Sequence, residues 1–307
     1  MALSFRDYLD SKAALDERSL NGAVRTAFLG SLRDRERLDC LDLGTGSGAS
    51  LARLFDAEAG ASMAITAVDR DPALVELAFK RTAVLLRARG FEVAIPEDGR
   101  LHAQRGGRRI KLECRVADLV GFDPPGYAGR FDAVIAHQLM DLLPVAVMAE
   151  RIAGWLRPGG VFYATLNYDG GTALFPGYRD AALEGRILAA YDESMERRRV
   201  HGHPSGGAHS GRRLYDALLR VGLEPVAYGA SDWSLSPIRR AYRDRDRLCL
   251  AALLEMIRDQ AAASGAVADP ALDGWYRHRL GELESGTLGL IVHQLDLLVE
   301  KPLAPPA

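Results

Sequence analysis

The stretch 38–50 constrains the fold of this chain more than any other part of the sequence. It reads Leu-Asp-Cys-Leu-Asp-Leu-Gly-Thr-Gly-Ser-Gly-Ala-Ser. The apolar run at its start is typical of a buried parallel strand, and a helical spacing of apolar residues begins near Ala49. Between them, Gly44, Gly46 and Gly48 allow tight turns and a close approach of the backbone to a ligand. We therefore expect a strand, a glycine loop and a helix N-terminus that together bind a nucleotide-type ligand.

The glycine spacing alone does not say which nucleotide is bound. Gly44-x-Gly46-x-x-Ala49 also fits the dinucleotide fingerprint. Asp42, however, stands two residues before the first glycine. A carboxylate there would repel a pyrophosphate, but it would attract the ammonium group of a methionine moiety. Asp42 therefore favours a cofactor with an amino-acid tail over NAD.

The stretch 41–48, Leu-Asp-Leu-Gly-Thr-Gly-Ser-Gly, resembles motif I of the class I S-adenosylmethionine-dependent methyltransferases. Later motifs of that family follow in order: a strand ending at Asp69, a strand ending at Asp118, a strand at 131–136, and Leu-Arg-Pro-Gly-Gly at 156–160. The resemblance covers residues 38–166, about half of the chain. It implies an α/β fold with a doubly wound, seven-stranded, mostly parallel sheet whose last strand is antiparallel.

The resemblance also implies cofactor-binding residues. Asp69, with its neighbour Arg70, would bind the ribose hydroxyls, and Asp118, with its backbone neighbours Ala117 and Leu119, would bind the adenine amino group. The strand end and the glycine loop would hold the rest of S-adenosylmethionine through Asp42, Gly44, Thr45, Gly46 and Gly48.

His137 ends the fourth strand and is a candidate catalytic residue. It would contact the methionine end of the cofactor or act as the base for the methyl acceptor. The alternative is a histidine that only forms hydrogen bonds at a strand end.

The second half of the chain completes the sheet and adds to it. Strands are expected at 223–230 and 288–299, with the turn into the last strand at 281–286 and a tail at 302–307. A hairpin insert at about 91–112 is expected to turn at Gly106-Gly107, and helical inserts at 175–210 and 236–286 would form a cap. Residues 1–35 are expected to be a helical extension that covers the active-site face or packs on a flank, and residues 36–307 to be the methyltransferase domain.

The acceptor is expected to be a small molecule. Asn167 and Tyr168 follow the fifth strand on the acceptor side of the crevice and are predicted to line the substrate pocket. Residues 137–140 read His-Gln-Leu-Met, which differs from the Asn/Asp-Pro-Pro-Tyr/Phe of many methylases of nucleic acid bases. The net charge of -2 also disfavours a nucleic acid partner. The acceptor atom and the oligomeric state stay open.

No metal site and no membrane segment are expected. His201, His203 and His209 lie in a Gly/Ser/Pro-rich stretch that is more typical of a loop than of a metal site. The sequence has no apolar run of transmembrane length and no signal-peptide core near its start. Its 3 cysteines are expected to be reduced packing residues, which predicts a cytoplasmic protein.

The sequence thus predicts S-adenosylmethionine-dependent methyl transfer to a small molecule. Two alternatives remain. One is another transfer on the same fold, such as aminopropyl transfer. The other is a non-catalytic S-adenosylmethionine-binding subunit whose helical additions form an interface.

Overall fold

The computed structural model describes residues 5–33, 35–55, 62–243 and 245–303. The strands of its large sheet are β1 (Arg37–Leu43), β2 (Ser62–Asp69), β3 (Glu92–Ala94), β4 (Leu101–Arg105), β5 (Arg108–Val116), β6 (Phe131–His137), β7 (Leu156–Phe175), β10 (Glu224–Ala230), β11 (Trp233–Leu235) and β12 (Gly289–Glu300). Within the described residues this sheet has ten strands in the order β10-β12-β7-β6-β1-β2-β5-β4-β3, with β11 paired to β12.

The predicted seven-stranded sheet is confirmed within this larger one. Strands β5, β2, β1, β6 and β7 run parallel to one another, whereas β12 lies antiparallel between β7 and β10. Two additions extend it: the hairpin of β3 and β4 beside β5, and the short strand β11 beside β12. The chain turns between β4 and β5 at the predicted pair Gly106-Gly107.

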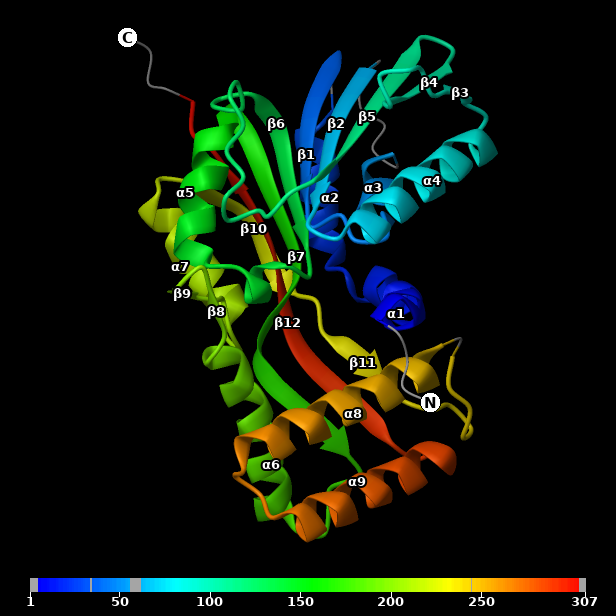
Figure 1. The fold of residues 1–307 in the computed structure, drawn as a ribbon, viewed down its shortest axis with the longest axis vertical. Helices are drawn as coiled ribbons and strands as arrows, with labels where there is room; N and C mark the ends of the chain where they lie inside the picture. The colour runs from blue at the N-terminus through cyan, green and yellow to red at the C-terminus, as the bar shows by residue number, and fades with distance from the viewer. Residues whose placement is uncertain (1–4, 34, 56–61, 244, 304–307) are drawn as a thin grey trace.

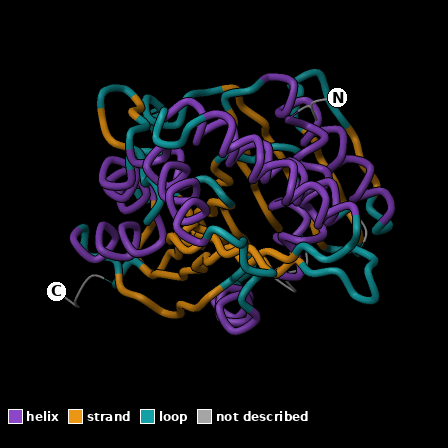
Figure 2. Tube along the Cα trace, turned by 90° about the horizontal axis from the view of Figure 1, so that it is seen from below, coloured by secondary structure: helices purple, strands orange, loops and turns teal. Residues whose placement is uncertain are grey.

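The sheet is covered on both faces, as the apolar runs of its central strands require. In β1, Leu38 and Cys40 pack into one core, and Leu41 and Leu43 into another. The first core is covered by α2 (Gly22–Ser31), α3 (Ala49–Leu54) and α4 (Pro72–Ala88), the second by α5 (Val145–Trp155) and α7 (Ser210–Arg220). Figure 2 shows helices on both sides of the strands.

A helical cap lies beyond one end of the sheet (Figure 1). Its helices are α6 (Ala181–Glu196), α8 (Asp246–Ser264) and α9 (Asp269–Glu284), and α1 (Phe5–Ser19) lies beside them. They share a third core. Inside the cap, the fully buried Arg279 pairs with Glu184, which also accepts the Trp275 indole N–H at 2.8 Å.

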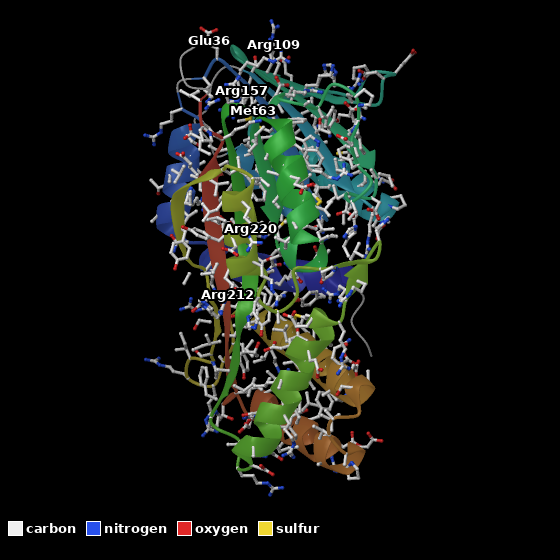
Figure 3. The ribbon with its side chains drawn as sticks, turned by 90° about the vertical axis from the view of Figure 1, so that its left-hand side faces the viewer. Glu36, Met63, Arg109, Arg157, Arg212 and Arg220 are labelled. Carbon is white, nitrogen blue, oxygen red and sulfur yellow. The ribbon has the colours of Figure 1, made fainter. Side chains whose placement is uncertain are left out.

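The carboxyl ends of the parallel strands face this cap. Glu36, just before β1, and Arg109 and Arg157, near the starts of β5 and β7, all lie at the far end of the molecule (Figure 3). In an open α/β sheet the ligand binds outside the carboxyl ends of the strands. The cap is therefore placed over the expected ligand site.

The two long strands β7 and β12 continue from the sheet into the cap (Figure 1). Between them lies a bulge, because Ala164 pairs with Leu297 and Asn167 with Leu295. The bulge frees the N–H of Leu166, which donates to Asp296 Oδ1 at 2.7 Å, and Leu166 has a φ of 54°. Asp296 Oδ2 also accepts the Asn21 N–H at 2.8 Å. One buried carboxylate thus holds the bend in the sheet and the start of α2.

Several predicted boundaries were wrong. The fifth strand was expected to end at Leu166, but β7 continues to Phe175 because pairing with β12 resumes after the bulge. The turn expected at 281–286 starts later, since α9 runs to Glu284. The third strand and the second arm of the hairpin are one strand, β5. Ala61, expected to start the second strand, lies outside the described residues, as do 304–307 of the predicted tail.

Two helix boundaries have direct physical causes in the sequence. Pro144 separates a short 3-10 helix, η1 (Met140–Leu142), from α5, as expected of a residue without an N–H. Asp71 caps α4 by accepting the N–H groups of Ala73 and Leu74, with Pro72 at the first turn.

The Asp296 carboxylate should be a large contributor to stability. Asp296→Ala leaves the N–H groups of Leu166 and Asn21 without their partner, so the free energy of unfolding in urea should fall by about 2–4 kcal/mol. Asp296→Asn keeps one acceptor oxygen and should lose about half as much. The control is Asp216→Ala on the exposed face of α7; equal stability of the two alanine variants would contradict this role for Asp296.

Candidate active site

The glycine loop is fixed to the end of the neighbouring strand. Gly44 and Gly46 have φ values of +64° and +51°, a backbone conformation that favours glycine. The N–H of Thr45 donates to the Val68 carbonyl at 3.0 Å, and the N–H of Gly46 donates to Asp69 Oδ2 at 2.8 Å. The loop therefore depends on Asp69 for its shape.

Gly48 and Asp42 lie beneath the loop instead of at its open side. A Cβ on Gly48 would come within 3.1 Å of Ala78 Cα, so this glycine allows close packing on α4. The fully buried Asp42 accepts a hydrogen bond from Ser50 Oγ at 2.8 Å, and its Oδ1 has no partner. Burial raises the pKa of Asp42 to about 6, and the nearby hydroxyls of Thr45 and Ser50 partly offset this.

A cavity of about 870 Å³ opens beside the loop, between the sheet and the cap. Its lining includes most of the residues predicted to bind the cofactor: Gly44, Thr45, Gly46, Asp69, Arg70, Asp118, Leu119 and His137. Asp42, Gly48 and Ala117 are not part of the lining. The N–H of Ala117 donates to the Asp69 carbonyl at 2.9 Å, which joins the ends of β5 and β2.

Of the two predicted substrate residues, one lines the cavity and the other does not. Tyr168 lines the cavity, and its hydroxyl donates to Asp192 at 2.7 Å. Asn167 does not line it: this residue is 1% exposed, and its side chain donates to the Leu295 carbonyl at 2.9 Å. The prediction for Asn167 fails because side chains alternate along a strand and its amide is used to hold β12.

Two side chains contact the same ring nitrogen of His137. Arg53 Nη1 lies 2.9 Å from Nδ1, and Thr165 Oγ1 lies 2.5 Å from the same atom. Because a guanidinium only donates, Nδ1 accepts and the ring proton is on Nε2. Burial, and then the charge of Arg53, lowers the pKa of His137 to about 4. The neutral ring with its proton on Nε2 can donate from that atom. The predicted roles of His137, contact with the cofactor's methionine end or action as a base, stay predictions.

The first helix supplies polar groups to the same place. Asp16 Oδ2 lies 3.7 Å from His137 Nε2, and Asp16 pairs with Lys12 at 2.5 Å. Gln138, whose φ is 47°, accepts from Lys12 and donates to Asp16 at 3.0 Å. Of the two positions expected for the N-terminal helices, α1 therefore covers the site, whereas α2 packs on the sheet. A buried network of this kind fixes the register of α1 over the cavity.

Two of the three histidines in residues 201–209 contact different parts of the chain. His201 Nε2 lies 3.2 Å from Asp118 Oδ2, and His209 Nδ1 lies 3.4 Å from the Asp169 carbonyl. His201 lies in the turn between β8 (Arg199–Val200) and β9 (His203–Pro204). Its contact with Asp118 therefore joins this hairpin to the loop after β5. Among the described residues, no group of three or more His, Cys, Asp or Glu side chains could hold a metal ion.

Comparisons with known proteins were made by sequence and by structure. No family model matches the sequence, and no curated protein matches it. A solved structure of a candidate methyltransferase from Bacillus halodurans C-125 matches with a TM-score of 0.52 at 12% identity, over 92% of this chain and 100% of that one. The chain has the class I methyltransferase fold. This conclusion rests on that match and on the strand order β5-β2-β1-β6-β7-β12-β10.

Two further solved structures are more distant. Geranyl diphosphate C-methyltransferase from Streptomyces coelicolor A3(2), solved with Mg²⁺, geranyl diphosphate and S-adenosyl-L-homocysteine, has a TM-score of 0.45 at 13% identity, over 91% of this chain and 78% of that one. A chain of the complex between the Haloferax volcanii Trm112 methyltransferase activator and a candidate methyltransferase has a TM-score of 0.44 at 18% identity, over 99% of this chain and 100% of that one.

The cavity lining also contains residues that the sequence analysis did not predict. They come from the first helix, the loop after β6, the cap and the last strand: Tyr8, Lys12, Asp16, Gln138, Asp141, Tyr191 and Gln294. The only signal for any of them was the Lys12–Asp16 spacing of four residues, which equally describes a solvated helical pair. No helix in the described part of the chain has the length and apolar character required to cross a membrane.

The buried Asp42 should make stability depend on pH. Its pKa of about 6 lies above the ordinary 3.8, so between these values the folded chain keeps a proton that the unfolded chain loses. Its contribution to stability therefore falls as the pH rises from about 4 to 6. Asp42→Asn cannot ionise, so relative to wild type its free energy of unfolding should gain about 2–3 kcal/mol between pH 4 and pH 7.

Urea unfolding of both proteins at each pH measures this gain. Ser50→Ala, which keeps the carboxylate and removes one of its partners, should not abolish the pH dependence. A difference between wild type and Asp42→Asn that is the same at pH 4 and pH 7 would contradict the assignment.

Proposed function

We propose that this protein is an S-adenosylmethionine-dependent methyltransferase that acts on a small molecule. The observation that carries the proposal is a single cavity with two different ends. One end is formed by the glycine loop and by Asp69 and Asp118 at the carboxyl ends of β2 and β5; the other is formed by the cap. A cofactor and an acceptor bound in one closed space would have their reacting atoms next to each other.

The residues present fit the cofactor. Asp69 uses its two oxygens for backbone N–H groups, at 2.8 Å to Gly46 and 3.0 Å to Asp71, and each carboxylate oxygen can accept a further hydrogen bond. Asp69 would accept the ribose hydroxyls, and Asp118 would accept the adenine amino group. His137 lines the cavity, and its Nε2–H, 3.7 Å from Asp16 Oδ2, would donate to the cofactor's carboxylate or to the acceptor.

S-adenosylmethionine supplies a methyl group on a sulfonium sulfur. What the chain would contribute is position and electrostatics: the loop and Asp69 would hold the donor, and the cap would cover the acceptor. The paired Lys12 and Asp16 and the neutral His137 add no net charge where the sulfonium charge disappears. This suits a reaction in which positive charge leaves the donor.

Titration calorimetry with S-adenosylhomocysteine and with S-adenosylmethionine tests the cofactor assignment. We expect dissociation constants well below about 1 mM, and weaker binding would count against the proposal. Asp69→Ala removes an acceptor for the ribose and releases the Gly46 N–H, so affinity should fall by about 1–3 kcal/mol, or roughly 5- to 150-fold.

The matched control for this titration is Asp216→Ala, which removes an exposed carboxylate from α7. Its affinity should equal that of wild type. If Asp69→Ala also binds like wild type, Asp69 is not part of the cofactor site.

A further inference from the structure

The acceptor half of the cavity has an apolar body. Its floor is the extension of β7, β12 and β11 into the cap, which presents Tyr168, Val292 and Trp233. Helix α8 covers this floor with Leu253 and Ile257. A molecule that fills this half must therefore have a substantial apolar part.

Polar groups without partners interrupt this apolar lining. The indole N–H of Trp233 is buried and has no hydrogen-bond partner. Gln294 is 3% exposed, and its carboxamide forms no hydrogen bond with any described residue. Gln294 lines the cavity, so its carboxamide is available to a ligand with polar atoms.

Two carboxylates line this half, Asp16 and Asp141, and Asp141 is the one whose cationic partner is more distant. It lies in η1, four residues beyond His137, and lines the cavity. Its nearest cation is Arg198, whose Nη1 lies 3.8 Å from Oδ2 on a side chain that is 37% exposed. Two further cations line this part of the cavity: Lys12, which is paired with Asp16 and Gln138, and Arg199, whose guanidinium donates to the carbonyls of Glu196 and Arg198. Burial raises the pKa of Asp141 to about 6, and Arg198 and Lys12 partly offset this.

Two tyrosines line the same cavity as this carboxylate. Tyr8 comes from α1 and Tyr191 from α6, and both line the cavity with Asp141. Burial raises the pKa of each phenol, and the negative charge of Asp141 adds to the rise in both. Aromatic rings and a carboxylate together are a favourable environment for an organic cation.

We propose that the methyl acceptor is an amine with an apolar body, and that Asp141, which shares the cavity with Tyr8 and Tyr191, binds the nitrogen and accepts its proton. The inference rests on the proposed function and names its substrate class. An anionic acceptor fits less well, because its charge would face both Asp141 and Asp16. Lys12 and Arg199 already donate to groups of the chain, and Arg198 faces Asp141.

The step balances with the groups present and the donor already proposed. The bound ammonium gives one proton to Asp141, which leaves a lone pair on nitrogen. The new N–C bond forms as the C–S bond breaks, and its electron pair stays on sulfur as a neutral thioether. The product leaves as a methylated ammonium ion, and Asp141 releases its proton to solvent. Near neutral pH a carboxylate with a pKa of about 6 is a more effective proton acceptor than an ordinary aspartate.

The test uses the full chain with S-adenosylhomocysteine present, and three amines as probes: 2-phenylethylamine, tryptamine and octylamine. Matched neutral and anionic probes are 2-phenylethanol and 3-phenylpropionate. We expect the amines to bind at least ten times more tightly than the matched probes, and to become methylated when S-adenosylmethionine replaces the product. In Asp141→Asn, amine affinity should fall at least tenfold while S-adenosylhomocysteine affinity changes less than twofold. Asp216→Asn is the matched control.

A pH series on wild type gives a second measurement that does not depend on the variant folding. Amine binding should be lost as the pH falls through about 6, because Asp141 becomes neutral while the amine keeps its charge. Equal or tighter binding of the alcohol or the acid, an undiminished amine affinity in Asp141→Asn, or a flat pH series would overturn the proposal. So would the absence of amine binding by a protein that binds S-adenosylhomocysteine. Failure to bind S-adenosylhomocysteine at all would instead overturn the proposed function.

Discussion

The structure depends on the antiparallel pairing of β7 with β12, which starts in the sheet and ends inside the cap. Most inserts in an α/β fold are attached through loops and can move against the sheet. Here the cap shares two strands with the sheet, so its position is set by backbone hydrogen bonds. The bulge at Leu166 turns the strands, and Asp296 holds that turn. The cavity is the space that this bend leaves between the carboxyl ends of the strands and the cap helices.

Burial then determines how the charges at the site behave. Asp42 and Asp141 are both carboxylates with raised pKa values, but they have different neighbours. Asp42 is covered by the loop and bonded to Ser50, so it supports the loop from below. Asp141 lines the cavity and has one distant cationic partner, which leaves it available to a ligand. His137 is neutral because it is buried beside Arg53, and so it acts as a donor.

The sheet could be predicted from sequence because each of its signals is local. The apolar run before Gly44 and the acidic ends of the next two strands are short patterns with a physical cause, and the fold of residues 38–166 followed from them. The bulge could not be predicted, because Asp296 and Leu166 are 130 residues apart and neither type is unusual in a strand. The sequence analysis also placed both Asn167 and Tyr168 in the pocket. Only Tyr168 lines it, because neighbouring side chains on a strand point to opposite faces.

The acceptor half of the site was the least predictable part. Its residues come from α1, η1, α6 and the last strand, and only the fold brings them together. A tyrosine, a lysine or a glutamine on an amphipathic element has no sequence pattern that separates a ligand contact from ordinary packing. The carboxylates of the cofactor half were found because they follow strands whose ends meet by topology.

The placement of α1 has an evolutionary consequence. The helix contributes Tyr8, Lys12 and Asp16 to the cavity, yet it precedes the first strand and takes no part in the sheet. Changes confined to this helix alter the surface that the acceptor meets and leave the glycine loop, Asp69 and Asp118 untouched. Under the proposed function, selection on α1 would change which acceptor is methylated, while the part that would bind the methyl donor stays constant.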